Sequence, residues 1–443
     1  MAINYDDFVL RILPDGTDKF RITADSTEGE EQGALGREVV EALESAARTG
    51  LVSAASSAIR ELDLAAEATV VNPQIGERLF ETFFQGAIRQ LFATSRTAAQ
   101  ARERGVRVKI RIDPREPRLA GISGLPWETL QDPETGRFLS LDRLNPVVRY
   151  LEVSEPNRPA PFRSPLRILV VIANPETTTP LDLDTERKAL KSAWRSDNVE
   201  IAFLERPTLD ALRQHLLSSP QHVFHFMGHG GFDDARGAGH LLFETSSGAP
   251  QPVRDEALAT VLRGEGRPRL VVLNACQTGR TSDQPGRQPF GGVAPALVRA
   301  GVPAVVAMRR GISDPAAIAF SKSLYERLAA GDSVDAAVAE GRIAMHNGDP
   351  DSLEWATPML FMRLPDGHLF AAQKESPAAG TTESSFEVGD IESHEEVLLF
   401  GELNQGLGAG RRASVPETLR TQVKAGDIKS GKGVCIGGRI NRS

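Results

Sequence analysis

The sequence predicts an α/β fold with a mostly parallel sheet and helices on both of its faces. Between residues 161 and 371, apolar runs of strand length alternate with short helical segments, as in successive βαβ units. The runs are apolar along their whole length, which is typical of strands buried on both faces of a parallel sheet. The predicted strands are 167–174, 199–205, 222–228, 270–275, 304–308 and 359–364, and the predicted helices are 185–194, 209–217, 254–262, 292–300, 315–329 and 334–345.

The N-terminal region, residues 1–160, is expected to be a further α/β part that packs on this core or forms part of the same unit. Alternating residues around a Pro-Asp-Gly corner predict a β-hairpin, and apolar stripes near 3.6-residue spacing predict two core-facing helices. The segment VRVKIRI alternates basic and apolar residues, which predicts a strand with one solvated face. Trp127 and Glu128 are expected to be a buried indole and a hydrogen-bonded neighbour. These elements are the hairpin 5–24, the helices 36–64 and 75–102, and the strand 106–112.

The C-terminal part of the chain predicts a separate β-rich module. A proline-rich connection sets a first domain boundary near residue 160, and the small, polar segment 372–385 predicts a flexible linker. Within the tail, 386–443, the segments VGDIESHEEVLLFGELNQ (388–405) and AGDIKSGKGVCIGGRINR (425–442) align at an offset of 37. Short β-prone segments with Gly and Asn at their corners predict two stacked β-arcs.

Composition excludes several classes of function. The chain has 443 residues and a net charge of −8, and its basic residues are dispersed, whereas binders of nucleic acid or anionic membranes need clustered positive charge. The N-terminus lacks the features of a signal peptide, and no run is long and apolar enough to span a membrane. The two cysteines, Cys276 and Cys435, cannot build a disulfide framework. We therefore expect a soluble, cytoplasmic protein that needs no cofactor.

A histidine and a cysteine each follow one of the apolar strands. His229 comes directly after 222–228, and Cys276 comes directly after 270–275, 47 positions later. Side chains just beyond the carboxyl ends of parallel strands face the crevice where open α/β sheets bind ligands. An imidazole there can take the proton of a thiol and create a thiolate nucleophile. The sequence therefore predicts a His-Cys dyad, with the backbone N–H groups of Gly230 and Cys276 as oxyanion donors.

Structural and metal-binding interpretations compete with this dyad. Taken alone, Cys276 is typical of a buried thiol and His229 of a satisfied histidine at a strand end, but the two together favour a site. A zinc site made of His222, His225, His229 and Cys276 is the next alternative. Strand alternation points His222 and His225 to opposite faces of the sheet, so they cannot converge on one ion. No metal is therefore expected, and His225 is predicted to be buried beneath His229.

The motifs around these residues carry a family resemblance. GHGG, followed by NACQTG, resembles the caspase-like cysteine peptidases and is closer to their CHAT domain branch, to which separase is also related. The segments GLPWETL, GRFLSLDRLNPVVR and FGGVAPALVRAGVPAVVAM also match that branch, as do 324–342, Trp355 and Pro358. The resemblance covers roughly residues 70 to 365. It departs from true caspases at Asn274, which stands where they have Gln.

The resemblance implies a caspase-hemoglobinase fold with His229 as general base, Cys276 as nucleophile, and the backbone of Gly230 and Cys276 as oxyanion donors. It also implies a cysteine endopeptidase that acts on a protein substrate as a regulated effector in bacterial signalling, defence or programmed cell death. Basic-specific relatives carry Asp two residues before the nucleophile, where this chain has Asn274. Asp233 or Asp234 is the alternative acidic wall of a specificity pocket.

The tail predicts a protein partner. Its layout resembles two-repeat β-solenoid amyloid signalling motifs, which implies an activating or recruiting partner through residues 386–443. Self-assembly is the other expectation, because arcs stacked from different chains would satisfy the open strand edges. A small β module that folds alone is a third interpretation. For the whole chain, the alternative function is a catalytically silent caspase-like scaffold that acts as an adaptor or assembly protein through these repeats.

Overall fold

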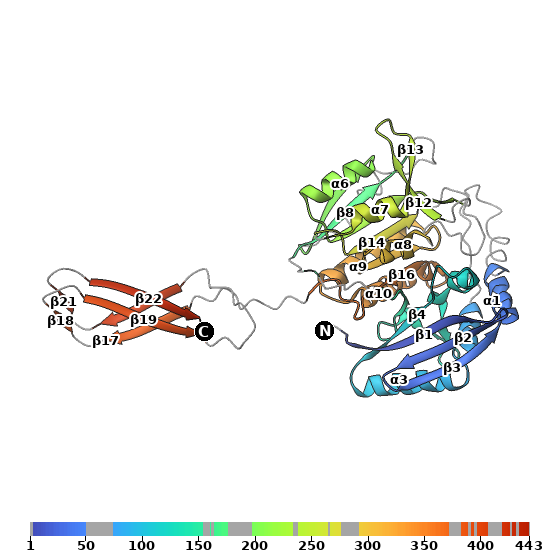
Figure 1. The fold of residues 1–443 in the computed structure, drawn as a ribbon, viewed down its shortest axis with the longest axis horizontal. Coiled ribbons are helices and arrows are strands. Elements are labelled where there is room, and N and C mark those ends of the chain that lie inside the picture. The colour runs from blue at the N-terminus through green and yellow to red at the C-terminus, as the bar shows by residue number, and fades with distance from the viewer. Residues whose placement is uncertain are drawn as a thin grey trace. The chain divides into compact units, whose positions relative to one another are not determined.

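The computed structural model describes two compact units, Met1–Ala372 and Gln373–Ser443 (Figure 1). The residues that it describes are 3–49, 74–153, 160, 164–175, 197–233, 238–264, 266–275, 292–371, 382–388, 391–393, 397–405, 419–425, 428–430 and 434–442. The predicted helix 185–194, residues 50–64 of the first predicted helix, and residues 372–381 of the predicted linker 372–385 lie outside these ranges. The linker prediction is wrong for its last four residues, which begin the strand Thr382–Val388.

One continuous sheet of eleven strands runs through the first unit (Figure 1). Its strands are β1 (Tyr5–Asp15), β2 (Lys19–Ser26), β3 (Gly29–Gly36), β4 (Gly105–Arg111), β7 (Val147–Tyr150), β8 (Leu166–Ile172), β9 (Val199–Glu205), β10 (Val223–Gly228), β14 (Leu270–Ala275), β15 (Ala304–Met308) and β16 (Pro358–Met362). Their order is β3-β2-β1-β4-β7-β16-β15-β14-β10-β8-β9. Neighbours are antiparallel in β3–β2–β1 and β15–β16 and parallel elsewhere, which confirms the predicted mostly parallel sheet.

Helices cover both faces of the part of the sheet formed by β8, β10 and β14–β16. The strands are apolar throughout because successive side chains point to opposite faces and both faces are packed. Val170, Val272 and Val306 belong to a core with α9 and α10, while Val171 and Leu273 belong to a core with α6, α7 and α8. These helices are α6 (Leu209–Ser218), α7 (Asp255–Leu262), α8 (Val293–Arg299), α9 (Asp314–Ala329) and α10 (Val334–Gly348).

The N-terminal region adds β1–β4 and β7 to this sheet, through pairing of Phe361 in β16 with Arg149 in β7. The 5–24 hairpin is confirmed as β1 and β2, but β3 was not predicted. The single helix predicted over 75–102 is wrong. Two helices form instead, because the helical conformation is interrupted before Gly86, whose φ of +55° lies outside the helical region. The helices here are α1 (Arg37–Thr49), α2 (Gln74–Phe83), α3 (Gly86–Ala101) and α4 (Ala120–Gly124).

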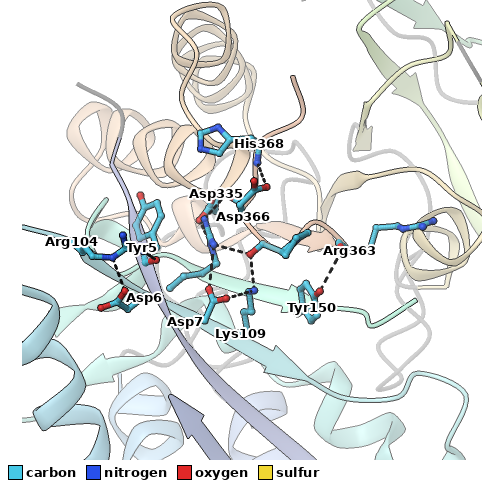
Figure 2. A network of polar contacts seen from close by, with 12 residues as sticks. Tyr5, Asp6, Asp7, Arg104, Lys109, Tyr150, Asp335, Arg363, Asp366 and His368 are labelled. Atoms are coloured by element: carbon cyan, nitrogen blue, oxygen red, sulfur yellow. Dashed lines mark hydrogen bonds and ion pairs between the residues drawn. The ribbon is translucent and has the colours of Figure 1, made fainter. Parts of the chain in front are cut away.

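The strand β4 also corrects the sequence-based prediction, since it has no solvated face. Arg107 and Lys109 are only 3% and 4% exposed, and both face acidic groups. Arg107 Nε lies 2.6 Å from an oxygen of Asp335 on α10. Lys109 Nζ lies 2.6 Å from Asp7 on β1 (Figure 2). Lys109 also donates to the carbonyl oxygen of Pro365, 2.8 Å away. The basic side chains are therefore buried because ion pairs and carbonyl groups replace water around them.

The segment between β4 and β7 is built from short elements around a buried tryptophan. Trp127 is fully buried, as predicted. Its ring packs against Phe83, and its Nε1 donates to the carbonyl oxygen of Ile122 at 2.9 Å. The short strands are β5 (Gln131–Asp132) and β6 (Arg137–Phe138), and the 3-10 turns of the unit are Pro117–Leu119, Trp127–Thr129, Leu139–Leu141 and Glu354–Ala356.

The second unit, described by itself, pairs the two sequence repeats, together with the residues just before each of them, strand for strand. Each pair is parallel and joins residues 37 positions apart, for example Ile391 with Ile428 and Val397 with Val434. The predicted stacking of two β-arcs is confirmed in this register. The strands are β17 (Thr382–Val388), β18 (Ile391–Ser393), β19 (Val397–Gln405), β20 (Leu419–Ala425), β21 (Ile428–Ser430) and β22 (Val434–Arg442), paired β17–β20, β18–β21 and β19–β22.

None of the helices in the described part of the chain has the length and apolar character that crossing a bilayer requires.

Candidate active site

The candidate site lies at the carboxyl edge of β10 and β14. These parallel strands stay paired up to Gly228 opposite Ala275. His229, the next residue after β10, is buried, with 7% of its surface exposed. The strand end is closely packed, because a Cβ on Gly228 would lie 2.9 Å from the carbonyl oxygen of Ala173. His229 therefore follows a buried strand end, as its position in the sequence predicts.

A small antiparallel sheet begins at His229 and was not predicted. It contains β11 (Gly230–Asp233), β12 (Ala238–Glu244) and β13 (Pro250–Arg254). The carbonyl group of His229 already accepts the backbone N–H of Leu242 at 2.9 Å. At the end of β12, the buried carboxylate of Glu244 accepts the backbone N–H of Asn174, just beyond β8, at 2.9 Å. This contact holds β12 at the carboxyl edge of the large sheet.

The two other histidines of this stretch, His222 and His225, make contacts away from the candidate site. His225 is buried, and its Nδ1 lies 2.5 Å from the hydroxyl group of Tyr325 on α9, as expected for a core histidine. Burial lowers the pKa of His225 to about 3, so the imidazole is neutral at physiological pH. His222 accepts the backbone N–H of Arg167 at Nδ1, 2.9 Å away, and burial, then the Arg167 charge, lower its pKa to about 4. Within the described residues, no three His, Cys, Asp or Glu side chains converge as a metal site requires.

The predicted site residues are only partly within the described ranges. Cys276 and Asp234 lie outside them, and Asp233 is described only as the last residue of β11. Asn274 lies on β14 and is 5% exposed. Its Oδ1 is buried and has no hydrogen-bond partner among the described residues, which is uncommon for a buried amide. The structure thus brings His229, Gly230 and Asn274 to one edge of the sheet.

A buried charge cluster at the end of β15 was only partly predicted. Glu128 is 1% exposed and accepts two hydrogen bonds of 2.8 Å from Arg149 on β7. Arg309, which follows β15, donates to the same carboxylate at 3.3 Å and to the carbonyl oxygens of Gly124 and Leu125 at 2.6 and 2.8 Å. Burial raises the pKa of Glu128, but the charges and hydrogen bonds of the arginines outweigh it and hold that pKa at about 2. The hydrogen bonding of Glu128 was expected. Its two arginine partners were not, because Arg149 and Arg309 are distant in sequence and meet only where the large sheet brings β7 and β15 near each other.

Comparisons with known proteins identify a family and similar structures. The CHAT domain model matches residues 73–378. Two crystal structures of the Saccharomyces cerevisiae separase–securin complex are similar to this chain, at 13% and 12% sequence identity and a TM-score of 0.45 in each case. Each match covers 81% of this chain and 30% of the other chain, so this chain spans under a third of the protein that it matches. None of the curated proteins matches the sequence.

Proposed function

This chain belongs to the CHAT domain family, and we propose that it is a cysteine endopeptidase that hydrolyses a protein substrate with His229 and Cys276. We further propose that it acts as a regulated effector in bacterial signalling, defence or programmed cell death.

The register of β10 and β14 is the observation that carries this proposal. The last paired residues are Gly228 and Ala275, and the next residues along the chain are His229 and Cys276. Neighbouring strands lie about 4.8 Å apart, and consecutive Cα atoms lie about 3.8 Å apart. This spacing of adjacent strand ends supports the proposal that the imidazole of His229 takes the proton of the Cys276 thiol.

The proposed reaction uses this pair in two steps. His229 takes the proton of Cys276, and the thiolate attacks the carbonyl carbon of the scissile bond. The N–H groups of Gly230 and Cys276 stabilise the oxyanion, and protonated His229 passes its proton to the leaving amine. A water molecule, activated by His229, then hydrolyses the thioester and releases the thiol.

Asn274 is the proposed specificity residue that the structure describes best. Its buried Oδ1 offers an acceptor at the edge of the site, which supports a substrate side chain that carries N–H donors. Asp233 and Asp234 stay proposals as pocket residues. Replacing Asn274 by Asp would add a carboxylate and is expected to move the cleavage preference toward Lys or Arg, as measured with a peptide library.

A cleavage assay on the full chain tests the peptidase. A Cys276→Ala variant should lose all cleavage of a peptide library and its labelling by a thiol-directed covalent probe. The matched control is Cys435→Ala, which removes the other thiol of the chain and should keep both. Cleavage by the Cys276→Ala variant would show that the nucleophile is wrongly assigned. If the wild type does not turn over even when its tail is clustered by an antibody, the silent scaffold is the better explanation.

We also propose that the tail recruits a protein partner or assembles with the tails of other copies. The two repeats carry complementary charges in register, which supports assembly. The acidic residues of β17, β18 and β19 each have a basic residue as register partner. Paired strands lie about 4.8 Å apart, so opposite charges at these positions favour the pairing and like charges oppose it. The pairs are Glu383 with Arg420, Glu387 with Lys424, Glu392 with Lys429, and Glu402 with Arg439.

This charge pattern supports head-to-tail stacking of copies of this chain. The charged residues of β17, β18 and β19 are all acidic and those of β20, β21 and β22 are all basic, so the second repeat of one copy would complement the first repeat of the next. Sedimentation of the full chain at low and high salt tests this, with assembly expected to weaken as salt rises. Changing the four glutamates to Lys should abolish assembly, and changing their four partners to Glu as well should restore it. A wild type that stays monomeric would leave an external partner as the role of the tail.

A further inference from the structure

A second histidine lies against the backbone next to His229. In the β11–β12 pair, Gly231 is the register partner of His240. A Cβ on Gly231 would lie 2.6 Å from Nε2 of His240 and 2.8 Å from its Cε1. The distal end of this imidazole therefore rests directly on the backbone of Gly231, in space that only a glycine leaves open.

The register also sets His240 and His229 on the same face of this small sheet. Successive residues of a strand alternate between faces, so positions 229 and 231 share a face, and register partners share it across the pair. The backbone N–H of Leu242 donates to the carbonyl oxygen of His229, which extends the register of β11 and β12 by one pair. Because His240 lies two residues before Leu242, the two histidines are diagonal neighbours across this pair of strands. Such neighbours lie about 7 to 8 Å apart, within reach of long or aromatic side chains. His240 is half-buried, so part of its ring meets solvent.

We propose that His240 is a second imidazole of the active site that hydrogen-bonds the peptide substrate and thereby contributes to specificity. The inference rests on the proposed peptidase function. A ring nitrogen of an imidazole can accept the N–H group or donate to the C=O group of a peptide. His240 rests on Gly231, the residue that follows the proposed oxyanion donor Gly230 and lies two positions from the proposed general base His229.

Two single variants perturb this imidazole in different ways. His240→Ala removes the ring. Gly231→Ala instead adds a methyl group that displaces the ring, because the clashing atoms are the movable end of a side chain rather than backbone. Gly231 has no positive φ, so Ala suits its backbone. Gly348→Ala is the matched control, since nothing lies within 4 Å of a Cβ at that glycine.

Steady-state kinetics on the best library peptide test the proposal. His240→Ala and Gly231→Ala should each lower kcat/KM by about ten-fold, mostly through KM, which corresponds to one lost hydrogen bond. The kcat/KM of the double variant should be no lower than that of the less active single variant, because both changes act on the same imidazole. His240→Gln, which keeps a donor and an acceptor, should recover most of the loss. Labelling of Cys276 by a thiol-directed probe should stay at the wild-type rate in all four variants.

The outcomes separate this inference from the peptidase assignment. Unchanged KM in both single variants, or additive losses in the double variant, would overturn the role of His240 while Cys276-dependent cleavage persists. Slower labelling of Cys276 would mean that the variants disturb the dyad, which also contradicts a substrate-binding role. Absence of Cys276-dependent cleavage in the wild type would overturn both proposals. If Gly231→Ala lowers the unfolding temperature more than Gly348→Ala, the comparison of His240→Ala with His240→Gln decides the question.

Discussion

Replacing Glu128 by Gln is expected to lower the free energy of unfolding by about 3 kcal/mol at pH 7. The substitution keeps the shape of the side chain and removes the carboxylate that pairs with the guanidinium groups of both Arg149 and Arg309. A carboxyl whose pKa falls from 4.5 to about 2 on folding contributes about 3 kcal/mol, at about 1.4 kcal/mol per tenfold change in the equilibrium constant. Loss of one partner from a buried ion pair costs a similar 3 to 5 kcal/mol or so.

The same pKa gives the sign of the pH dependence. Because the pKa of Glu128 is lower in the folded state, its contribution is complete above pH 4.5 and is lost as the pH falls through about 2. At pH 3 the difference between wild type and Glu128→Gln should therefore shrink to about 1 kcal/mol. Urea unfolding at pH 7 and pH 3 measures it, with Glu326→Gln on the exposed side of α9 as control. A difference that stays equal at both pH values, or matches the control, would refute the reasoning.

Two further predictions concern other buried polar contacts. Arg107→Met should lower the free energy of unfolding by about 3 to 5 kcal/mol, because it leaves the buried carboxylate of Asp335 without its 2.6 Å partner. Urea unfolding measures this, and adding Asp335→Asn should recover part of the loss; no recovery would contradict it. Tyr325→Phe should cost about 1 to 3 kcal/mol by removing the contact with His225. It should leave the pH profile of cleavage unchanged, since His225, with a pKa of about 3, is neutral throughout the physiological range; a shifted profile would contradict this.

Some features of this protein are properties of short sequence windows, and the sequence by itself determined them. Apolar runs between helical stripes identify the strands and their burial, because strand and helix periodicities are local. The positions of His229 and Cys276 after such runs are equally local. The 37-residue repeat determined the register of the tail, since pairing like with like aligns its apolar and polar positions.

Other features depend on which distant segments meet, and only the tertiary structure decided them. Arg107 and Lys109 alternate with apolar residues as solvated side chains do, yet β1 pairs alongside β4 and α10 supplies Asp335 from more than 200 residues away. Likewise, His240 carries no local sign of a site until antiparallel pairing sets it on Gly231. Burial of a charge or the approach of an imidazole depends on partners remote in sequence, which no local periodicity encodes.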